Sequence, residues 1–321
     1  MFFTPFLYHY KGTTQKVVRV GRYLKLLCIF PGAIGDFILS LPVFKSLKYK
    51  VNPDLFELWV DRVNLQLAHH VTFTDKAVAL SDTGIDRYPT PNVFFQRIQQ
   101  FDRVLSWFGT SNIDFVQSVK KVHKQVNFLS FLPDKYNQHL TDFRTGQLEN
   151  IFGKLNDYKT TPEVCWGTDD YWYAKEFLGN LNNKPKAVIH PGASGLQKQW
   201  AIKNFSDVAI SLVSDRKMKM FLVQGPLDEK PVSILSSSLE NSGIPFKKIQ
   251  EKSLSRLAAI LLHCQVYVGN DSGITHLAAV LGIPTLAIFI STNPLIWRPQ
   301  GSHVRVLIQP TVEKILSNVP S

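Results

Sequence analysis

The sequence predicts an α/β fold with doubly wound parallel sheets, and three observations lead to this prediction. Short runs of β-branched and aromatic residues alternate with helix-like segments, and about five such strand–helix steps follow one another in the C-terminal half. Most of these strands end in turns of glycine, proline and small polar residues. The length of 321 residues, with 45% hydrophobic residues, exceeds one ordinary core and suits two globular domains.

The first predicted strand and its loop begin the N-terminal half. The run Lys25–Phe30 predicts a buried strand, and the apolar run Phe37–Leu47 predicts the helix after it. Small residues in the loop between them let backbone amides approach a ligand: Gly32, Ala33 and Gly35. The spacing G-x-x-G-D differs from the dinucleotide fingerprint G-x-G-x-x-G. Asp36 then has two interpretations, a helix N-cap or a general base facing a cleft, and spacing alone favours the cap.

The rest of the N-terminal half has a weaker pattern. Strands are predicted at 55–60, 102–108 and 126–132, with helical segments between them. The polar stretch 156–186 holds two prolines around one helical segment, 169–178, which is typical of a linker. We therefore expect an N-terminal domain over residues 1–165, a linker region over 166–186, a C-terminal domain over 187–310 and a terminal helix over 311–321.

The C-terminal half alternates more regularly between strands and helices. Strands are predicted at 187–190, 220–224, 266–268 and 285–290. Helices are predicted at 205–213, 254–262, 274–281 and 311–318. The carboxyl ends of parallel strands meet at one edge of a sheet, and that edge is where open α/β sheets bind ligands.

Three turns are therefore expected to share this edge: residues 190–194, 224–226 and 270–273. Their small residues and hydroxyls precede helices, which suits a phosphate because free amides and the positive helix end receive it. The candidate ligand-binding residues within them are Gly192, Ser194, Asp271, Ser272 and Gly273.

Two further side chains follow these turns. Lys198 is placed to add a positive charge to a diphosphate, and His276 lies one helical turn beyond Ser272, so both can face one ligand. Each also has a plainer interpretation: Ser272 as an N-cap, Lys198 as a solvated side chain and His276 as a buried imidazole with its hydrogen bonds made. Convergence on one edge favours anion binding over three unrelated structural roles.

The net charge of +11 is concentrated at the N-terminus. Residues 1–50 carry eight Lys or Arg residues against one acidic residue, Asp36. Such a region suits an anionic partner, which the composition leaves open as a membrane surface, a phosphorylated glycolipid or nucleic acid, or else it is a solvated basic surface. No zinc-finger spacing, arginine-rich tract or RNA-recognition signature supports nucleic acid.

The remaining composition bounds the class of protein. No apolar run is as long as a membrane span, and the N-terminus lacks the pattern of a signal peptide. Cys28, Cys165 and Cys264 lack C-x-x-C spacing, which indicates buried thiols in a reducing compartment. No metal-ligand spacing is found either, so no metal is expected.

Four motifs in order resemble glycosyltransferase family 9, the lipopolysaccharide heptosyltransferases. The first is Gly32–Asp36 followed by Leu41-Pro42, and the second is His190–Ser194 followed by Lys198-Gln199-Trp200. The third is Asp271–Ala279 with Leu281–Pro284, and the fourth is Trp297–Gly301. Each motif alone is weak, but the four together span residues 25–310 in the family's order.

The resemblance implies a GT-B architecture, in which two Rossmann-like domains face each other across a cleft. It implies an inverting, metal-independent transfer of a sugar from a nucleotide-sugar donor, ADP-heptose or similar, to a lipopolysaccharide-core or related glycan acceptor. Asp36 matches the catalytic base, Lys198 the lysine on the donor diphosphate, and Glu229 loosely matches an acidic residue that holds the ribose. Asp271, Ser272, Gly273 and His276 match the donor-binding turn. No cofactor is implied. An anionic glycolipid acceptor would place the protein in the cytoplasm, peripherally on the inner face of the cytoplasmic membrane.

Two features depart from the family pattern: Ile290 stands where glycine is usual, and an extension precedes Lys25. Three alternatives follow in order. They are a GT-B transferase or epimerase using another sugar nucleotide, a non-catalytic protein that binds sugar nucleotides or glycolipids, and a nucleic-acid-binding protein.

Overall fold

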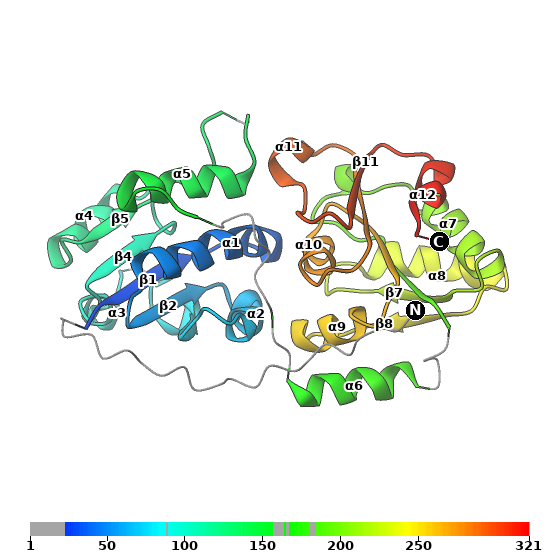
Figure 1. The fold of residues 1–321 in the computed structure, drawn as a ribbon, viewed down its shortest axis with the longest axis horizontal. Helices are drawn as coiled ribbons and strands as arrows, with labels where there is room; N and C mark the ends of the chain where they lie inside the picture. The colour runs from blue at the N-terminus through cyan, green and yellow to red at the C-terminus, as the bar shows by residue number, and fades with distance from the viewer. Residues whose placement is uncertain are drawn as a thin grey trace.

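The computed structural model describes residues 23–87, 89–135, 137–156, 164, 167–179 and 184–320. These residues form two α/β domains, each built on its own parallel sheet, that lie side by side (Figure 1). The expected two-domain α/β architecture is confirmed. Residues 1–22 and Cys165 lie outside the described residues, so half of the basic side chains expected in the first fifty residues do too.

The N-terminal sheet has five parallel strands in the order β3-β2-β1-β4-β5. Their bounds are β1 Lys25–Phe30, β2 Leu55–Val60, β3 Lys76–Ala79, β4 Arg103–Ser106 and β5 Val126–Phe128. The central strand β1 is buried after its first residue, as its continuous apolar run requires when helices cover both faces.

The C-terminal sheet has six parallel strands in the order β11-β10-β9-β6-β7-β8. Their bounds are β6 Lys186–His190, β7 Lys219–Val223, β8 Phe246–Ile249, β9 Val266–Asn270, β10 Thr285–Phe289 and β11 Val304–Ile308. The order reverses between β6 and β9, and the carboxyl ends of these two strands carry two of the turns that the sequence singles out. The reversal is the point at which open α/β sheets bind ligands.

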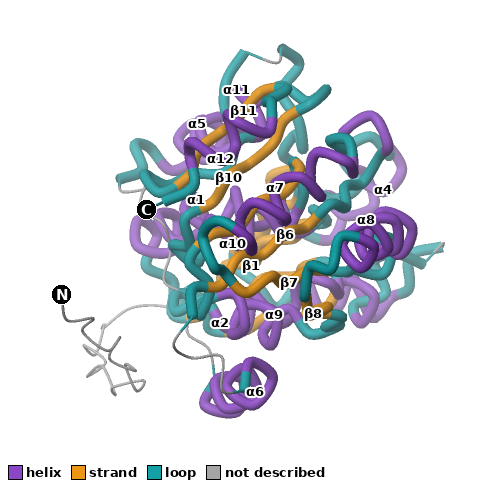
Figure 2. The backbone as a smooth tube through the Cα atoms, turned by 90° about the vertical axis from the view of Figure 1, so that its right-hand side faces the viewer, coloured by secondary structure: helices purple, strands orange, loops and turns teal. Residues whose placement is uncertain are grey.

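Helices pack on both faces of each sheet (Figures 1 and 2). Those of the N-terminal domain are α1 Ile34–Val51, α2 Leu65–His70, α3 Asn92–Ile98, α4 Ile113–Val122 and α5 Leu140–Phe152. Those that follow are α6 Thr168–Leu178, α7 Ile202–Ser214, α8 Glu229–Asn241, α9 Leu254–Leu261, α10 Gly273–Val280, α11 Pro294–Trp297 and α12 Val312–Asn318. Short 3₁₀ turns lie at Arg62–Asn64, Leu80–Asp82 and Leu196–Lys198.

One apolar core is shared by the two domains. It joins side chains of α1, α2 and α5 to side chains of α6, α9 and α10, while separate clusters lie behind the sheets under α3 and α4 and under α7, α8 and α12. The expected linker helix α6 packs on α9, and α1 packs on α10. Because α1 and α10 each follow a central strand, their contact brings the carboxyl edges of the two sheets together.

The boundaries of several elements differ from the sequence-based expectation. The helix expected from Phe37 begins at Ile34, three residues earlier, and Ala33 is its N-cap residue. Asp36 is therefore not the N-cap, and that interpretation is wrong. The strand expected over 102–108 is only Arg103–Ser106, and the one over 126–132 is only Val126–Phe128.

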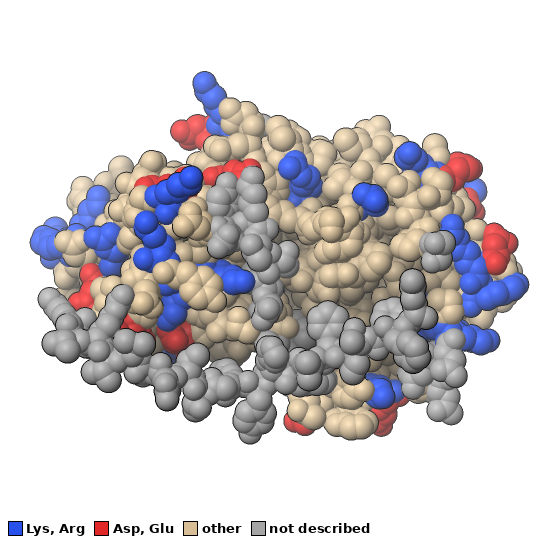
Figure 3. Space-filling view, viewed as in Figure 1, with Lys and Arg blue, Asp and Glu red and all other residues tan. Residues whose placement is uncertain are grey.

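Two expectations on composition can be compared with the structure. Cys28 and Cys264 are buried, and burial raises the pKa of both thiols, that of Cys264 to about 12. Within the part of the chain that is described, no helix is long and apolar enough to cross a membrane. On the face shown in Figure 3, basic side chains gather toward the outer end of each domain.

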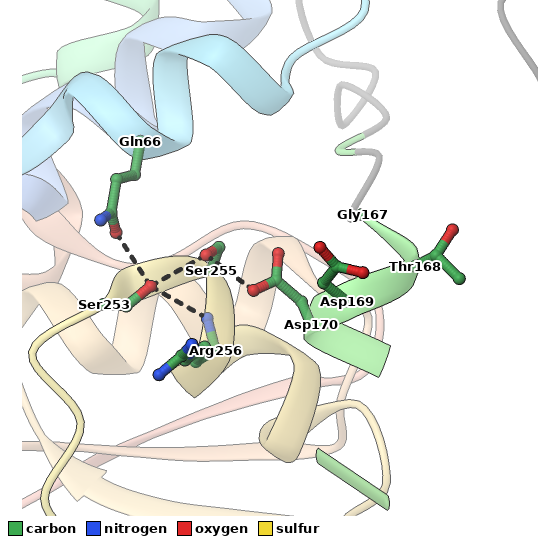
Figure 4. Close-up of a pocket in the computed structure, with 8 residues that line it drawn as sticks. All are labelled: Gln66, Gly167, Thr168, Asp169, Asp170, Ser253, Ser255 and Arg256. Atoms are coloured by element: carbon green, nitrogen blue, oxygen red, sulfur yellow. Dashed lines mark hydrogen bonds between the residues drawn. The ribbon is translucent and has the colours of Figure 1, made fainter. Parts of the chain in front are cut away.

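A side chain of the N-terminal domain caps a helix of the C-terminal domain. The amide oxygen of Gln66 in α2 accepts hydrogen bonds from the backbone of Leu254, at 2.8 Å, and from the hydroxyl of Ser253, at 3.2 Å. Ser253 is itself the N-cap of α9. The bonds border a surface pocket of about 640 Å³ between α2, α6 and α9 (Figure 4).

Replacing Gln66 with alanine is expected to loosen this contact. Loss of a cap typically destabilises by about 1 kcal/mol, so the melting temperature should fall by about 2–4 °C. Hydrogen exchange should quicken at the Leu254 amide, measured by mass spectrometry on the peptide that spans the start of α9. Gln117→Ala, at an exposed position of α4, is the matched control. Equal exchange in both variants would show that Gln66 does not cap the helix.

Candidate active site

The three turns expected at the C-terminal sheet edge are joined by one buried carboxylate. We call residues 190–194, 224–226 and 270–273 the rim turns. Asp228, just before α8, accepts a hydrogen bond from Nε2 of His190 at 2.8 Å and from the amide of Gly225 at 2.9 Å. Nδ1 of the same imidazole lies 3.2 Å from Oγ of Ser272. One side chain therefore fixes all three rim turns relative to each other.

Two rim-turn glycines give Asp228 its space. A Cβ atom at Gly192 would overlap the carboxylate, and one at Gly225 would lie 2.7 Å from Oδ2. Burial raises the pKa of Asp228, but the hydrogen bonds from His190 and from the Gly225 amide outweigh it and hold this pKa below its ordinary value. The carboxylate is therefore ionised and accepts both bonds.

The third rim turn is itself fixed by local bonds. Ser272 is the N-cap of α10, and its hydroxyl accepts from the Thr275 amide at 3.3 Å, so the expected cap is present. The side chain of Asn270 donates to the Pro191 carbonyl at 2.8 Å and accepts from the Trp200 amide at 2.9 Å. These bonds tie β9 to the turn after β6 and leave the start of α10 facing the other domain.

Asp271 and Lys198 form an ion pair on this rim. Nζ of Lys198 lies 3.2 Å from Oδ2 of Asp271, and the Thr292 hydroxyl donates to the same oxygen at 2.8 Å. Nε2 of His276 lies 3.8 Å from Oδ1. Burial raises the pKa of Asp271, but His276 and the Lys198 charge outweigh it and hold this pKa below its ordinary value. Lys198 is therefore not freely solvated, because its ammonium group is paired with a carboxylate of the same rim.

The two domains touch where α1 and α10 begin. A Cβ atom at Gly35 would lie 3.0 Å from Cδ2 of His276, and one at Gly273 would lie 2.8 Å from Cβ of Ile34. The absence of side chains at these glycines lets the helix ends approach. His276 is 3% exposed, and its Nδ1 has no hydrogen-bond partner, so the interpretation of a buried imidazole with all bonds made is wrong.

Asp36 lies in the first turn of α1 beside a buried arginine. Oδ1 of Asp36 is 3.4 Å from a terminal nitrogen of Arg144, whose other terminal nitrogen donates to the Asp36 carbonyl at 2.9 Å and to Ser40 at 2.7 Å. The Asp36 side chain is 16% exposed and that of Arg144 is 0% exposed. Arg144 thus holds the carboxylate from behind, while the carboxylate keeps access to solvent.

Aromatic rings enclose the Arg144 guanidinium. Its central carbon lies 5.0 Å from the ring centre of Phe30 and 5.1 Å from that of Phe131. Burial lowers the pKa of Arg144 to about 10, although Asp36 raises it, so the group remains charged at neutral pH. A fixed positive charge therefore lies behind the candidate base.

A second contact between the two domains joins His139, the N-cap residue of α5, to the residues that follow α11. Nε2 of His139 is 2.9 Å from the Arg298 carbonyl, and the Gln300 amide is 3.3 Å from Nδ1 of His139. Burial lowers the pKa of His139, which favours a neutral imidazole. Leu39, Leu140 and Ile296 pack into a small cluster beside it. The motif Trp297–Gly301 thus reaches the N-terminal domain through its backbone.

The structure brings most of the sequence-predicted residues to one interdomain rim. Ile34 and Gly35 meet the start of α10 there, and Asp36 follows them in the first turn of α1, with Lys198 farther along the same rim. Ser194 and Glu229 are exposed, the latter at the first position of α8. The remaining loop residues, Gly32 and Ala33, precede α1 directly.

Sequence reasoning missed four residues of this group: Arg144, Asp228, Thr292 and His139. All four contribute through partners distant in the chain, so a local pattern carries no signal for them. Across the part of the chain described, no group of three or more histidine, cysteine, aspartate or glutamate side chains is suited to a metal ion.

Two Rossmann-like domains with facing carboxyl edges, rim turns suited to a phosphate and a carboxylate on the opposite domain form a GT-B architecture. The sequence profile of glycosyltransferase family 9 (heptosyltransferase) matches residues 146–316. The chain belongs to this family, as the resemblance predicted.

Relatives and solved structures agree with this assignment. Lipopolysaccharide heptosyltransferase 3 of Escherichia coli is 24% identical over 290 residues, which cover 84% of this chain and 83% of the relative. The fold is similar to that of E. coli ADP-heptose lipopolysaccharide heptosyltransferase II, with a TM-score of 0.71 and 16% identity over 92% of this chain and 97% of that one. A family 9 glycosyltransferase of Veillonella parvula has a TM-score of 0.74 and 18% identity over 92% of this chain and 91% of its own.

Proposed function

We propose that the chain transfers a heptose, or a similar sugar, from an ADP-activated donor to a lipopolysaccharide-core or related glycan acceptor, with inversion at the anomeric carbon and without a metal. One observation carries the proposal: the rim turns of the C-terminal sheet contact the first turn of α1, which holds Asp36. A donor bound at the rim would present its sugar to that carboxylate. The E. coli relative and the structural neighbour are named for lipopolysaccharide and for ADP-heptose, which supports this choice of substrates.

The donor half of the site is assigned to the C-terminal domain. The diphosphate would lie against Gly192, Ser194 and the start of α10, where helix amides favour an anion. Lys198 would exchange its bond to Asp271 for one to the diphosphate and offset the charge of the leaving group. Asp271, Ser272, Gly273 and His276 would hold the donor around its sugar, and Glu229 would accept from the ribose hydroxyls.

The acceptor half is assigned to the N-terminal domain. Asp36 would accept the proton of the attacking hydroxyl as the new glycosidic bond forms and the bond to the diphosphate breaks. The loop residues Gly32, Ala33 and Gly35 would border the acceptor. An acceptor that is an anionic glycolipid fits the basic N-terminal region and would hold the enzyme peripherally at the cytoplasmic membrane face.

We also propose the domain limits that the sequence predicts. The acceptor domain spans residues 1–165, the linker region 166–186, the donor domain 187–310 and the terminal helix 311–321. α6 lies in the linker region and packs on α9, and α12 packs on α7. Both contacts support grouping these segments with the donor domain.

A donor and acceptor screen tests the function. The purified chain is incubated with ADP-heptose, UDP-sugars or GDP-sugars and a heptose-deficient lipopolysaccharide core, and nucleotide release and product mass are followed. The expected result is ADP release with an acceptor mass raised by one heptose, and an anomeric proton that NMR assigns to the inverted configuration. Release from UDP- or GDP-sugars instead would reject the donor, and binding without transfer to any acceptor would reject the enzyme.

Replacing Lys198 with alanine tests the donor half. Because a charge-assisted hydrogen bond contributes about 1.5–3 kcal/mol, ADP should bind about tenfold more weakly and transfer should slow by at least as much. The expected loss of ADP affinity stays within this range, because Lys198 must break its ion pair with Asp271 when it binds the diphosphate. Calorimetry with ADP and steady-state rates measure the two effects.

Lys203→Ala is the matched control, since this lysine is close in the chain but exposed and paired with Asp207. It should leave both the ADP affinity and the rate unchanged. Equal behaviour of the two variants would remove Lys198 from the site.

A further inference from the structure

A hydrogen-bonded chain links Asp228, His190 and Ser272 behind the rim turns. Asp228 is 9% exposed and His190 is 3% exposed, so their contact is largely shielded from water. The distances are 2.8 Å from Asp228 to Nε2 of His190 and 3.2 Å from Nδ1 to Oγ of Ser272. Neither side chain takes part in the proposed sugar transfer.

The bonds determine where each proton lies. An ionised carboxylate only accepts, so Nε2 of His190 must carry a hydrogen and donate it to Asp228. In a neutral imidazole Nδ1 then has no hydrogen and can only accept. The hydroxyl of Ser272 therefore donates its single proton to Nδ1. In this state Ser272 has no proton left for a ligand.

The other neighbours of Ser272 also keep its proton within the protein. Its oxygen accepts from the Thr275 amide and lies 3.1 Å from the Thr275 hydroxyl, which donates to the Asn270 carbonyl and can itself accept the serine proton. Tyr267 contacts that same threonine hydroxyl at 3.2 Å, and burial raises the pKa of its phenol, so it stays protonated. Neither neighbour frees the serine proton.

A second proton on His190 would reverse the role of Ser272. Nδ1 would donate to the serine oxygen, and the serine hydroxyl would be free to turn toward the rim and donate to a phosphate oxygen. The imidazolium charge would lie behind that bond, and Asp228 would remain its counter-ion. A bound phosphate favours the protonated state of His190 for two reasons. It gains a hydrogen bond from Ser272, and it lies near the positive charge of the imidazolium.

We propose that Asp228 and His190 act as positioning residues that switch Ser272 from acceptor to donor, so that binding of the donor diphosphate is coupled to uptake of a proton at His190. The proposal rests on the proposed function, since it places the diphosphate at the rim turns. The titratable groups that face His190 among the described residues are Asp228, from the start of α8, and Tyr267, from β9 through Ser272 and Thr275. Lys198 and Asp271 pair with each other farther along the rim.

The coupling sets the direction of the pH dependence. Binding that takes up a proton weakens as pH rises, because the proton must come from a more dilute supply. The ADP affinity should therefore fall with increasing pH, by at most about tenfold per pH unit. It should become independent of pH at low pH, where the imidazole is protonated before the ligand arrives.

Calorimetry of ADP binding in buffers of different ionisation enthalpy measures the coupling. At about pH 8 the terminal phosphate of ADP is already ionised, so any proton taken up from the buffer on binding goes to the protein and not to ADP. The expected result is an uptake approaching about one proton per bound ADP in the unaltered chain. Inorganic pyrophosphate should also bind, since the site recognises phosphate oxygens and not the base.

His190→Gln separates this mechanism from a structural role. The amide can donate to Asp228 and accept from Ser272, but it cannot take up a proton. ADP should still bind, about tenfold more weakly at neutral pH if one good hydrogen bond is lost, with no proton uptake and no dependence on pH. His303→Gln is the control, because this histidine lies outside the rim turns and bonds the Ala279 carbonyl. Its proton uptake should equal that of the unaltered chain.

The outcomes are distinguishable. ADP binding by the unaltered chain without proton uptake overturns the switch alone and leaves the donor site in place, even if the glutamine variant fails to fold. Uptake that persists in His190→Gln assigns the proton elsewhere and also overturns the switch. Failure of every nucleotide and of pyrophosphate to bind overturns the donor site and the switch together.

Discussion

Replacing Asp36 with asparagine is expected to lower kcat by about 10²–10⁴-fold, the range that a positioned general base contributes. The amide has nearly the same shape but cannot take the proton of the acceptor hydroxyl. ADP affinity should change little, because Asp36 lies on α1, across the interface from the rim turns. Single-turnover rates with saturating donor, together with calorimetry of ADP, separate the two quantities.

Asp114→Asn is the matched control for this prediction. Asp114 also lies in the first turn of a helix of the N-terminal domain, α4, and is exposed on the outer side of the sheet. It should retain the full rate. A loss of ADP binding in Asp36→Asn with an unchanged rate at saturation would reassign Asp36 from base to donor contact.

The rim turns could be predicted from sequence because their signals are local. Strand, small polar turn and helix follow within about ten residues, so the strand end, the Ser272 cap and the helix start are all visible in one stretch. The parallel order of the strands then places separate turns on one edge. Each step uses neighbours in the chain, and the structure has the same arrangement.

The start of α1 could not be predicted in the same way. The apolar run begins at Phe37, and Gly35 is a poor helix former, so the sequence favours a later start with Asp36 as cap. The structure instead begins the helix at Ile34, where Gly35 packs against His276 of the other domain. The tertiary contact overrides the local preference and turns Asp36 from a cap into a side chain on the first turn.

The sequence also could not predict which side chains contact the candidate site residues. Arg144 is 108 residues from Asp36, and Asp228 is 38 residues from His190. Lys198 and Asp271 were both expected at this edge, but their ion pair, between residues 73 positions apart, was not. Long-range pairing of this kind follows from the packing of α5 on α1 and from the strand order, neither of which a local pattern contains.

Arg144 is expected to matter for activity far more than for stability. Burial lowers its pKa to about 10 despite the attraction of Asp36, which means that its surroundings disfavour the charge. Its Nε also has no hydrogen-bond partner. A buried charge under these conditions stabilises the fold little, so we infer that it is retained to hold the Asp36 carboxylate in position and ionised.

Arg144→Met should therefore reduce kcat by about 10²-fold while leaving the melting temperature unchanged or slightly raised. The methionine keeps much of the volume, and its sulfur can pack on Phe30 and Phe131. Asp36 does not become a buried, unpaired charge, because its side chain is 16% exposed and can be solvated. Calorimetric unfolding and single-turnover rates measure the two effects. A fall of more than about 5 °C in melting temperature would make Arg144 a structural residue.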